Sequence, residues 1–544
     1  MSHRITHFRN GTVFDGHRYI GATEVLVGAG RILQLGSPGS LQPDPTATDV
    51  VDLAGGLLLP GFTDAHIHAV QGGLERNRCD LTRGQTRDDY RRLIAAYARS
   101  NPDQPWVLGG GWSMPAFPGG TPLLTDVDDL VPDRPLFLPN RDHHSAWVNS
   151  AALGLAGVDR HTPDPPDGRV ERDSDGNPTG TLHEGAMKLV SRLVPAPTDA
   201  EYYRAFQVAQ DHLHSLGITG WQEAIVGAYS GMEDPGPTYR LASQRGELTG
   251  RVVGALWWGR GRGLEQLPEL QQQRADYSTD RFRATSVKIM QDGVAENFSA
   301  ALLAPYLDRC GHPTDNAGHS FFTAVELREA VSALDAAGFQ VHVHAIGDRG
   351  VREALDAFVG TDPINRHHIA HLQLVHPDDI ERFAELGVTA NLQMLWACED
   401  DQMRDLTIPF IGADRAGWQY PFAGLQRAGA QLAAGSDWPI SSANPLEAIH
   451  VGVNRAEYDA SSPPGPAFLP EQRLSLEVAL AAYTSGSARL NQQADQPGAT
   501  GVIAPGALAD LVVLDRDPFT APDDEIAAAT VTSTWIDGLP VYQR

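Results

Sequence analysis

The sequence predicts an α/β protein built on a TIM-type (β/α)8 barrel, with a small β-sandwich made from both chain ends and a subdomain inserted after the first barrel strand. Three observations support this fold class. Helices alternate with short apolar runs through the middle of the chain, eight of these runs are candidate strands, and both ends are rich in strands. Repeated helix–strand alternation is typical of βα units, and eight such units are typical of a barrel.

The two chain ends share one pattern, in which apolar and polar residues alternate between Gly-containing turns. Near the amino end it occurs in GTVFDG, ATEVLVGAGRILQLG and TDVVDLAGGLLLPG, and near the carboxyl end in TGVIAPGALADLVVLD. In TWIDGLPV, Asp537-Gly538 between apolar flanks predicts a two-residue hairpin. Because chain termini often lie close together, we expect residues 1–62 and 500–544 to form one β-sandwich domain.

The barrel is predicted over residues 63–499. Amphipathic helices there end at glycine, and Gly338 and Gly387 stand where a helix needs a positive φ. The apolar runs that follow do not alternate cleanly, as expected of parallel strands buried on both faces. The eight candidate strands are LLLPGFTDAHIH, ITGWQEAI, RVVGALWWG, ATSVKIMQDG, FQVHVHAIGD, RHHIAHLQL, VTANLQML and QLAAGSDWPI.

One stretch, at about residues 72–195, does not follow this period. It is rich in Pro, Gly and Asp, as in FPGGTP, HTPDPPDG and RDSDGNPTG. We interpret it as an inserted subdomain after barrel strand one, with a strand of its own at RPLFLPNRD.

Composition limits the partners of this chain. It has 544 residues, 42% of them hydrophobic, and a net charge of −26, which disfavours nucleic acid and anionic membranes. No apolar run has the length of a membrane span, and no secretory signal is evident. Cys79, Cys310 and Cys398 are odd in number and far apart, which fits a reducing cytoplasm. We expect a small-molecule substrate; a homodimer is one of the quaternary states that the sequence leaves open.

Side chains that bind metals fall at the carboxyl ends of the predicted strands, where barrel active sites form. His66 and His68 end strand one and point to the same side, since residues i and i+2 do so on a strand. His344 ends strand five, His371 ends strand six, and Asp437 follows strand eight. Imidazole suits Zn²⁺, so the pattern predicts a centre of one or two Zn²⁺ ions, with another divalent metal as the alternative.

Lys288 lies inside the apolar fourth strand, where lysine is costly. The chain holds only one other lysine, Lys188, which we interpret as a solvated helix position. A buried amine can lose its proton and take up CO₂ to become a carbamate, which could bridge two cations, whereas arginine could not. The alternative is a lysine whose amine reaches solvent at the strand end.

These motifs together resemble the amidohydrolase superfamily, and within it the family-3, YtcJ-like branch that includes N-substituted formamide deformylases. The resemblance covers essentially the whole chain, and the motifs that carry it are GFTDAHIH, HAIGD, IAHLQL, AAGSDWP, GGGW, RDHHSAWVNSAAL and GNPTGTLHEGA. It implies that His66 and His68 hold a first metal, that His344 and His371 hold a second, and that carboxylated Lys288 bridges the two. It also implies that Asp437 is both a ligand and the catalytic base.

The chemistry expected of such a centre is hydrolysis. Zn²⁺ lowers the pKa of bound water to about 7, and the resulting hydroxide can attack a carbonyl carbon. We expect an amidohydrolase acting on a small neutral linear amide, such as an N-substituted formamide or N-acyl amine. A deaminase or cyclic amidase, and a carbamate or ester hydrolase, remain alternatives with the same centre, and a non-catalytic regulatory protein is a third reading.

Substrate selection is expected from loops and from the inserted subdomain. Four residues are candidates for substrate binding at the pocket wall: Trp112, His144, Trp396 and Trp438. For His144 the alternative is a loop histidine that caps the backbone, and the family resemblance favours a hydrogen bond to the substrate. Trp396 follows strand seven and Trp438 adjoins Asp437, which places both at the predicted mouth. Two carboxylates have other expected roles: Asp64 would orient a ligand imidazole or act structurally, and Glu184 would stand at a helix terminus, with an approach to the metals as its alternative.

Overall fold

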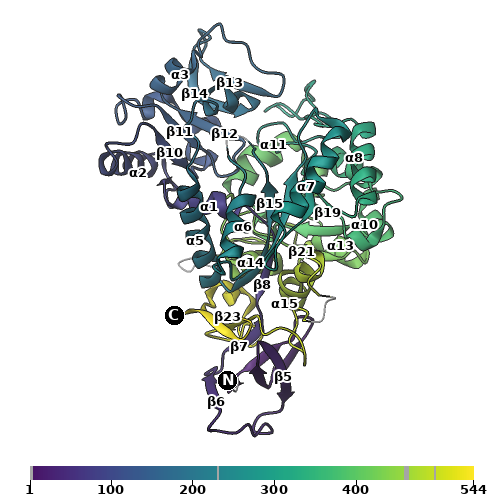
Figure 1. Cartoon of the computed structure of the whole chain (residues 1–544). Coiled ribbons are helices and arrows are strands. Elements are labelled where there is room, and N and C mark those ends of the chain that lie inside the picture. Colours follow the sequence, from purple (N-terminus) through teal and green to yellow (C-terminus); the bar gives the residue numbers. More distant parts are fainter. Residues whose placement is uncertain (1–3, 230–231, 459–464, 495–497) are drawn as a thin grey trace.

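The computed structural model describes residues 4–229, 232–458, 465–494 and 498–544, and its architecture confirms the predicted fold class. The barrel occupies the centre, the inserted subdomain lies over one end of it, and the β domain lies at the other end (Figure 1). Residues 1–3, at the start of the predicted β domain, lie outside the described residues. No described helix is long and apolar enough to cross a membrane.

The barrel sheet has eight parallel strands in chain order, and all eight candidate strands are confirmed. Their bounds are β8 (Phe62–Ile67), β15 (Ile218–Val226), β16 (Arg251–Trp257), β17 (Phe282–Met290), β18 (Gln340–Ala345), β19 (His368–His371), β20 (Thr389–Leu392) and β21 (Leu432–Ala434). The segment after β21 returns to β8: Asp437 N–H donates to His66 O at 2.7 Å, and His68 N–H donates to Trp438 O at 2.8 Å. These two backbone bonds close the carboxyl mouth of the barrel.

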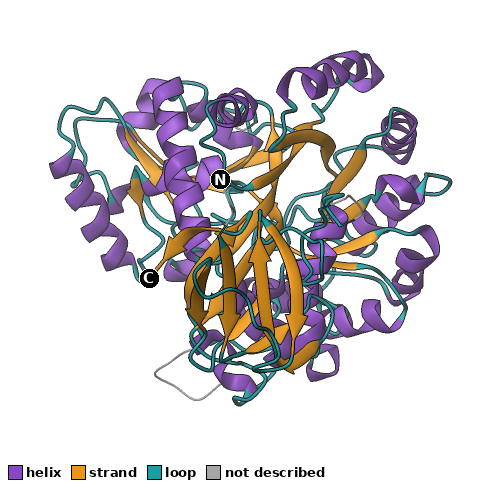
Figure 2. Ribbon diagram, turned by 60° about the horizontal axis from the view of Figure 1, so that its bottom comes forward, coloured by secondary structure: helices purple, strands orange, loops and turns teal. Residues whose placement is uncertain are grey.

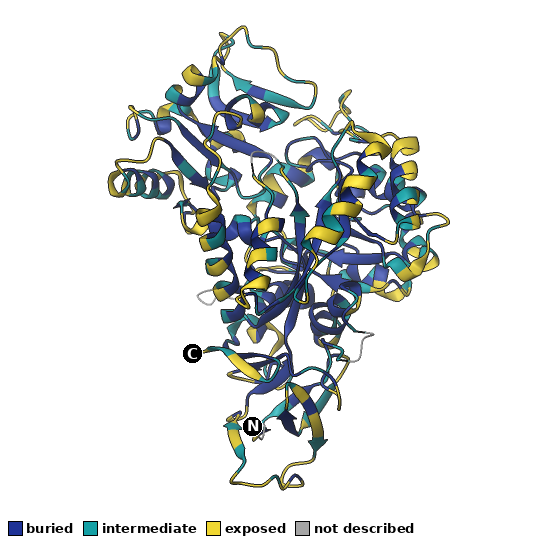
Figure 3. Ribbon diagram, in the orientation of Figure 1, coloured by how far each residue is buried: buried dark blue, intermediate teal, exposed yellow. Residues whose placement is uncertain are grey.

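Helices surround the sheet, and the strands inside are almost wholly buried (Figure 3). The helices are α5 (Asp199–Ser215), α6 (Gly236–Gln244), α7 (Leu267–Tyr277), α8 (Ala324–Ala336), α9 (Asp348–Ala357), α10 (Ile380–Leu386), α11 (Ile408–Ile411), α12 (Ala413–Ala416), α13 (Phe422–Arg427), α14 (Pro445–Asn454), α15 (Leu476–Ala481) and α16 (Ser487–Leu490). The predicted helix ends are confirmed, since Gly338 and Gly387 have φ of 69° and 66°.

The β domain is built from both chain ends, as Figure 2 shows by the strands gathered beside the barrel. One sheet holds β1 (Ile5–Arg9), β4 (Glu24–Gly28), β5 (Arg31–Gly36) and β6 (Thr48–Asp52). The other joins β2 (Thr12–Phe14), β3 (Tyr19–Ala22) and β7 (Leu57–Pro60) to β22 (Leu511–Leu514), β23 (Val531–Ile536) and β24 (Leu539–Gln543). Asp537 and Gly538 have φ of 50° and 71° and connect β23 to β24, which confirms the predicted hairpin.

The inserted subdomain carries a six-stranded sheet that begins soon after β8. Its strands are β9 (Cys79–Asp80), β10 (Val107–Gly110), β11 (Leu136–Pro139), β12 (Ser145–Val148), β13 (Gly168–Arg172) and β14 (Pro178–Glu184). The predicted strand in RPLFLPNRD is β11. The accompanying helices are α1 (Ala69–Arg76), α2 (Arg87–Ser100), α3 (Ser150–Ala156) and α4 (Lys188–Ser191), where Lys188 is exposed as predicted.

A buried ion network fastens the barrel to the β domain. Arg251, on β16, donates to both oxygens of Asp510, at 2.6 and 3.3 Å, and also pairs with Asp537. Asp510 is only 2% exposed and accepts the Asp537 N–H at 2.9 Å as well. Removing one partner of such a pair leaves a desolvated charge behind, so the network couples the two domains.

Replacing Asp510 by alanine tests this coupling. Arg251 keeps Asp537 but loses its buried partner, so the free energy of unfolding should fall by about 2 kcal/mol. The midpoint of urea unfolding, followed by circular dichroism, would report the loss. Asp49→Ala is the matched control, because the Arg4–Asp49 pair is similar in geometry but exposed, and its loss should not move the midpoint. Equal midpoints for Asp510→Ala and the wild type would contradict the assignment.

Candidate metal centre

A pocket of about 1070 Å³, part of it open to solvent, lies between the carboxyl mouth of the barrel and the inserted subdomain. Its floor is polar. Every one of the six residues predicted as metal ligands lines it: His66, His68, Lys288, His344, His371 and Asp437. They come from β8, β17, β18, β19 and the segment after β21, so strands far apart in sequence converge at one point.

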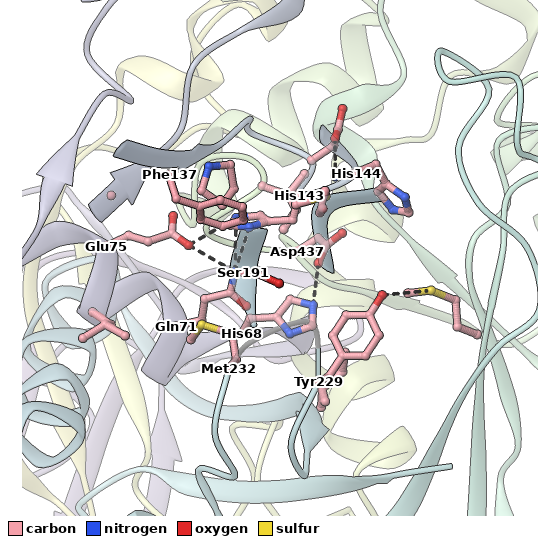
Figure 4. A pocket seen from close by; sticks show the side chains of 18 of the residues that line it. His68, Gln71, Glu75, Phe137, His143, His144, Ser191, Tyr229, Met232 and Asp437 are labelled. Carbon is pink, nitrogen blue, oxygen red and sulfur yellow. Dashed lines mark hydrogen bonds and ion pairs between the residues drawn. The ribbon is translucent and has the colours of Figure 1, made fainter. Parts of the chain in front are cut away.

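Asp437 holds the centre of this cluster (Figure 4). Its Oδ1 lies 3.2 Å from Nε2 of His66 and 3.2 Å from Nε2 of His68, and its Oδ2 lies 3.9 Å from Nδ1 of His371. Ligand atoms of His66, His371 and Asp437 all lie within 4.8 Å of one another. One carboxylate facing three imidazoles at this spacing is an arrangement that can hold a divalent cation.

The protonation of these imidazoles favours metal binding. Burial lowers the pKa of His344 and His371 well below the usual range, and burial together with Lys288 lowers that of His66 to about 3. Neutral imidazole is the form that binds a metal. Both ring nitrogens of His371 are buried without a hydrogen-bond partner among the described residues. Because an unpartnered buried polar atom is costly, these nitrogens fit a bound ion.

The backbone at two of these positions is unusual. His371 and Asp437 have φ of 82° and 56°, in the left-handed region that favours glycine. Non-glycine residues are held there only where the surrounding structure fixes them, and such positions cluster at functional sites. The unusual φ values therefore agree with a constrained centre.

Lys288 is buried beside the same cluster, with an exposed fraction of 1%. Its Nζ lies 3.4 Å from His66 Nε2 and 3.5 Å from His342 Nε2, and no carboxylate of the described residues forms an ion pair with it. Burial lowers the pKa of Lys288 to about 7, although Asp437 opposes that shift. The alternative of a lysine reaching solvent at the strand end is therefore wrong.

A second layer of side chains holds the ligands in place. His342 Nε2 lies 2.8 Å from His66 Nδ1, so His342 orients the ring of His66, the first predicted ligand. The sequence signal for it was its place two residues before His344, on the same strand face. Asp64 contacts no imidazole; its Oδ1 accepts the backbone N–H of His66 at 3.0 Å and of Ser436 at 3.1 Å, and so supports barrel closure.

His367 precedes β19, and His368 is the first residue of that strand. His367 pairs with Asp335 at 3.0 Å, away from the pocket. His368 lies deeper, with its ring centre 4.1 Å from that of His342.

Of the four predicted wall residues, only His144 lines the pocket. Trp112 is fully buried in the core of the inserted subdomain, where its indole donates to Leu138 O at 2.7 Å. Trp396 stacks parallel to the ring of His371, with ring centres 5.3 Å apart. Trp438 turns away from the pocket toward His212, with ring centres 5.2 Å apart. The three tryptophans therefore pack outside the pocket, behind the residues that line it.

Smaller apolar side chains form the wall instead. The inserted subdomain and the segment after it supply Leu74, Leu108, Phe137, Met187 and Val194, and the barrel side supplies Ile225, Met232, Met290 and Ile440. No single sequence pattern links these residues, because they come from separate loops, helices and strands. The result is a polar floor under a largely apolar chamber.

Polar side chains on two sides of the pocket wall were not predicted. Glu75 Oε1 lies 3.2 Å from His143 Nε2, and Gln71 bridges the pair by contacts of 3.1 and 3.0 Å. Burial raises the pKa of Glu75 to about 8 and lowers that of His143 to about 3. Tyr229 stands on the opposite side (Figure 4) and donates to Met290 Sδ at 3.4 Å.

Comparison with known proteins identifies the family and the fold. The sequence model of the amidohydrolase family matches residues 49–542. YtcJ of Bacillus subtilis is 29% identical over 500 residues, which cover 91% of each chain. The N-substituted formamide deformylase of Arthrobacter pascens is 26% identical over 554 residues, 96% of this chain and 95% of that protein. The crystal structure of an uncharacterized metal-dependent hydrolase from Pyrococcus furiosus superposes with a TM-score of 0.70 at 26% identity, covering 95% of this chain and 100% of that one.

Metal analysis of purified variants tests the ligand set. We expect one or two ions per chain in the wild type, and His66→Ala and His371→Ala should retain well under one, because each removes a neutral imidazole from the cluster. Elemental analysis by mass spectrometry gives the ratio. His367→Ala, at the residue just before β19 and outside the pocket, is the matched control and should keep the wild-type content. A full complement of metal in both ligand variants would rule out this centre.

Proposed function

Because the chain belongs to the amidohydrolase family, we propose that it hydrolyses the C–N bond of small neutral linear amides, such as N-substituted formamides or N-acyl amines, with Zn²⁺ as its metal. The observation that carries the proposal is the convergence of the six ligand-type side chains beneath a largely apolar chamber. The 26% identity to an N-substituted formamide deformylase supports the same substrate class.

The metal would be held by His66, His68, His344, His371 and Asp437. A bound divalent ion supplies Lewis acidity and makes water a usable nucleophile near neutral pH. We propose that Lys288 carries a carbamate, which would bring a negative charge to a cluster that otherwise has one carboxylate facing several imidazoles. The buried amine without an ion-pair partner supports this.

Asp437 would act as the base. Imidazoles on two sides hold its carboxylate on the pocket floor, where it can accept a proton from the attacking water. The water oxygen bonds to the carbonyl carbon, the C–N bond breaks, and the proton passes from Asp437 to the leaving nitrogen. The products are a carboxylate and an amine.

The chamber supports a neutral substrate. Its apolar side chains would bury the substituents of the amide. We also propose that the protein works in the cytoplasm. Its three cysteines are all free, which suits a reducing compartment.

Product release from a substrate panel tests the function, with Asp437→Asn as the diagnostic variant. Formamides, N-acyl amines, carbamates, esters and cyclic imides would be incubated with metal-loaded protein, and released amine or ammonia would be quantified. We expect amine from the linear amides. Asp437→Asn should lower kcat at least about 100-fold, because it removes the proton acceptor, while most of the metal stays bound.

The control for this variant is Asp49→Asn, an exposed position far from the pocket, which should keep the wild-type rate. Turnover of only cyclic or carbamate substrates would replace the proposed substrate class with one of the alternatives. Full activity in Asp437→Asn would remove Asp437 as the base.

Carbamate formation on Lys288 has its own spectroscopic test. Protein equilibrated with ¹³C-bicarbonate should show a carbamate carbonyl resonance, and Lys288→Arg should abolish it, because a guanidinium stays protonated and does not react with CO₂. The chain holds no other lysine than Lys188, which remains in the variant as an internal control. A signal of equal size in Lys288→Arg would assign the carbamate elsewhere.

A further inference from the structure

Two neighbouring histidines in the loop before β12 serve opposite sides of the pocket. His143, at φ 61°, faces helix α1 and pairs with Glu75. His144 faces the other way and pairs with Glu184. Figure 4 shows Glu75 and Gln71 on one side of His68 and Asp437, with His144 and Tyr229 on the other.

Glu184 grips the His144 ring with both of its oxygens. His144 Nδ1 lies 2.9 Å from Oε1 and 3.0 Å from Oε2, in surroundings where the two side chains are only 10% and 16% exposed. Burial alone would lower the pKa of His144, but the charge and hydrogen bond of Glu184 raise it to about 9. The pair is therefore an ion pair at neutral pH, in which Nδ1–H donates to the carboxylate.

The surrounding structure fixes the backbone of Glu184, and with it the contact between Glu184 and His144. Glu184 has φ 49° and ψ −127°, at the end of β14, which is strained for a residue with a side chain. Its amide N–H donates to His144 O at 2.9 Å, so the two residues are tied through backbone as well as side chain.

The barrel fixes the pair from behind. Ser299, in the loop after β17, donates to Glu184 Oε1 at 2.7 Å, and Asn297 of the same loop donates to His144 O at 3.1 Å. That loop also carries Gly293, whose carbonyl lies 3.3 Å from Nε2 of His344. The loop after β17 thus contacts both the His144–Glu184 pair of the inserted subdomain and His344 of the barrel.

These contacts leave one polar atom of His144 uncommitted. Nδ1 is engaged by Glu184, and Nε2 has no hydrogen-bond partner among the described residues, although His144 lines the pocket. Its ring centre lies 6.2 Å from that of His344. A protonated Nε2 at the pocket wall is a donor held ready for a substrate oxygen.

We propose that His144 donates a hydrogen bond from Nε2 to the carbonyl oxygen of the bound substrate, and that Glu184 is a positioning residue that acts through His144. This inference rests on the proposed hydrolase function. Negative charge grows on the carbonyl oxygen when water adds to the carbon, and a fixed, charged donor stabilises that charge more than it stabilises the substrate. Loss of this hydrogen bond should therefore lower kcat more than it changes KM.

A double-mutant cycle tests the proposal, with a substrate that the wild type hydrolyses. His144→Ala should lower kcat about 100-fold with KM changed by less than about threefold, since a donor used mainly in the transition state is lost. Glu184→Gln should lower kcat about tenfold. The double variant should be no slower than His144→Ala alone, because Glu184 has nothing left to position.

Controls separate positioning from stability. The same subdomain holds a matched pair outside the pocket, His183 with Glu171 at 2.9 Å, so Glu171→Gln should keep the wild-type kcat. Metal content and thermal midpoint are measured for each variant. His144→Gln, which keeps a donor and much of the side-chain volume, replaces His144→Ala if that variant does not fold, and should keep more activity than any variant without a donor.

The outcomes are distinct. Wild-type kcat in His144→Ala, or multiplicative losses in the double variant, would overturn this inference while leaving the hydrolase function standing. A wild type that hydrolyses no member of the substrate panel would remove the proposed function, and the inference would fall with it.

Discussion

The backbone bonds that join β8 to the segment after β21 are the constraint on which the site depends. They bring Asp437 between His66 and His68, and Asp64 reinforces them by accepting the N–H groups of His66 and Ser436. Without closure of the barrel, the carboxylate and the first two imidazoles would belong to opposite edges of an open sheet. The centre is therefore a direct consequence of the fold, in the way that carboxyl-end sites of barrels generally are.

Burial then determines the chemistry of the cluster. Burial holds His66, His344 and His371 neutral and lowers the pKa of the Lys288 amine. Among the described residues, several buried nitrogen atoms of the cluster lack hydrogen-bond partners, which is unfavourable. A bound metal ion would supply the missing interaction. His342 contacts the other ring nitrogen of His66 and would hold that ring in place for the ion.

The sequence predicted the parts of this molecule that local pattern encodes. Buried strands are apolar runs, and side chains at their carboxyl ends share one mouth, so all eight strands and the six clustered residues could be named in advance. The residues of the pocket wall could not be predicted in this way. Trp112 and Trp438 are large aromatic residues close to pocket residues in the chain, yet both side chains pack into hydrophobic cores. Glu184 does stand at a helix terminus, as the residue before the 3-10 turn Gly185–Met187. Its pairing with His144, forty residues earlier in the chain, could not be predicted, because no periodicity links the two.

This difference arises because the barrel and the inserted subdomain contribute different parts of the site. The barrel supplies the ligands, and their positions are set by strand register, which sequence pattern reveals. The inserted subdomain and adjacent loops supply the chamber and the His144–Glu184 pair, and their positions are set by contacts between segments with no shared repeat. Hydrolysis therefore depends on the geometry of a closed sheet, whereas the shape of the chamber depends on how the subdomain packs against the loop after β17. Because Ser299 and Asn297 of that loop hold both members of the pair, a change in that seating would move the substrate-facing donor relative to the ligands without touching either.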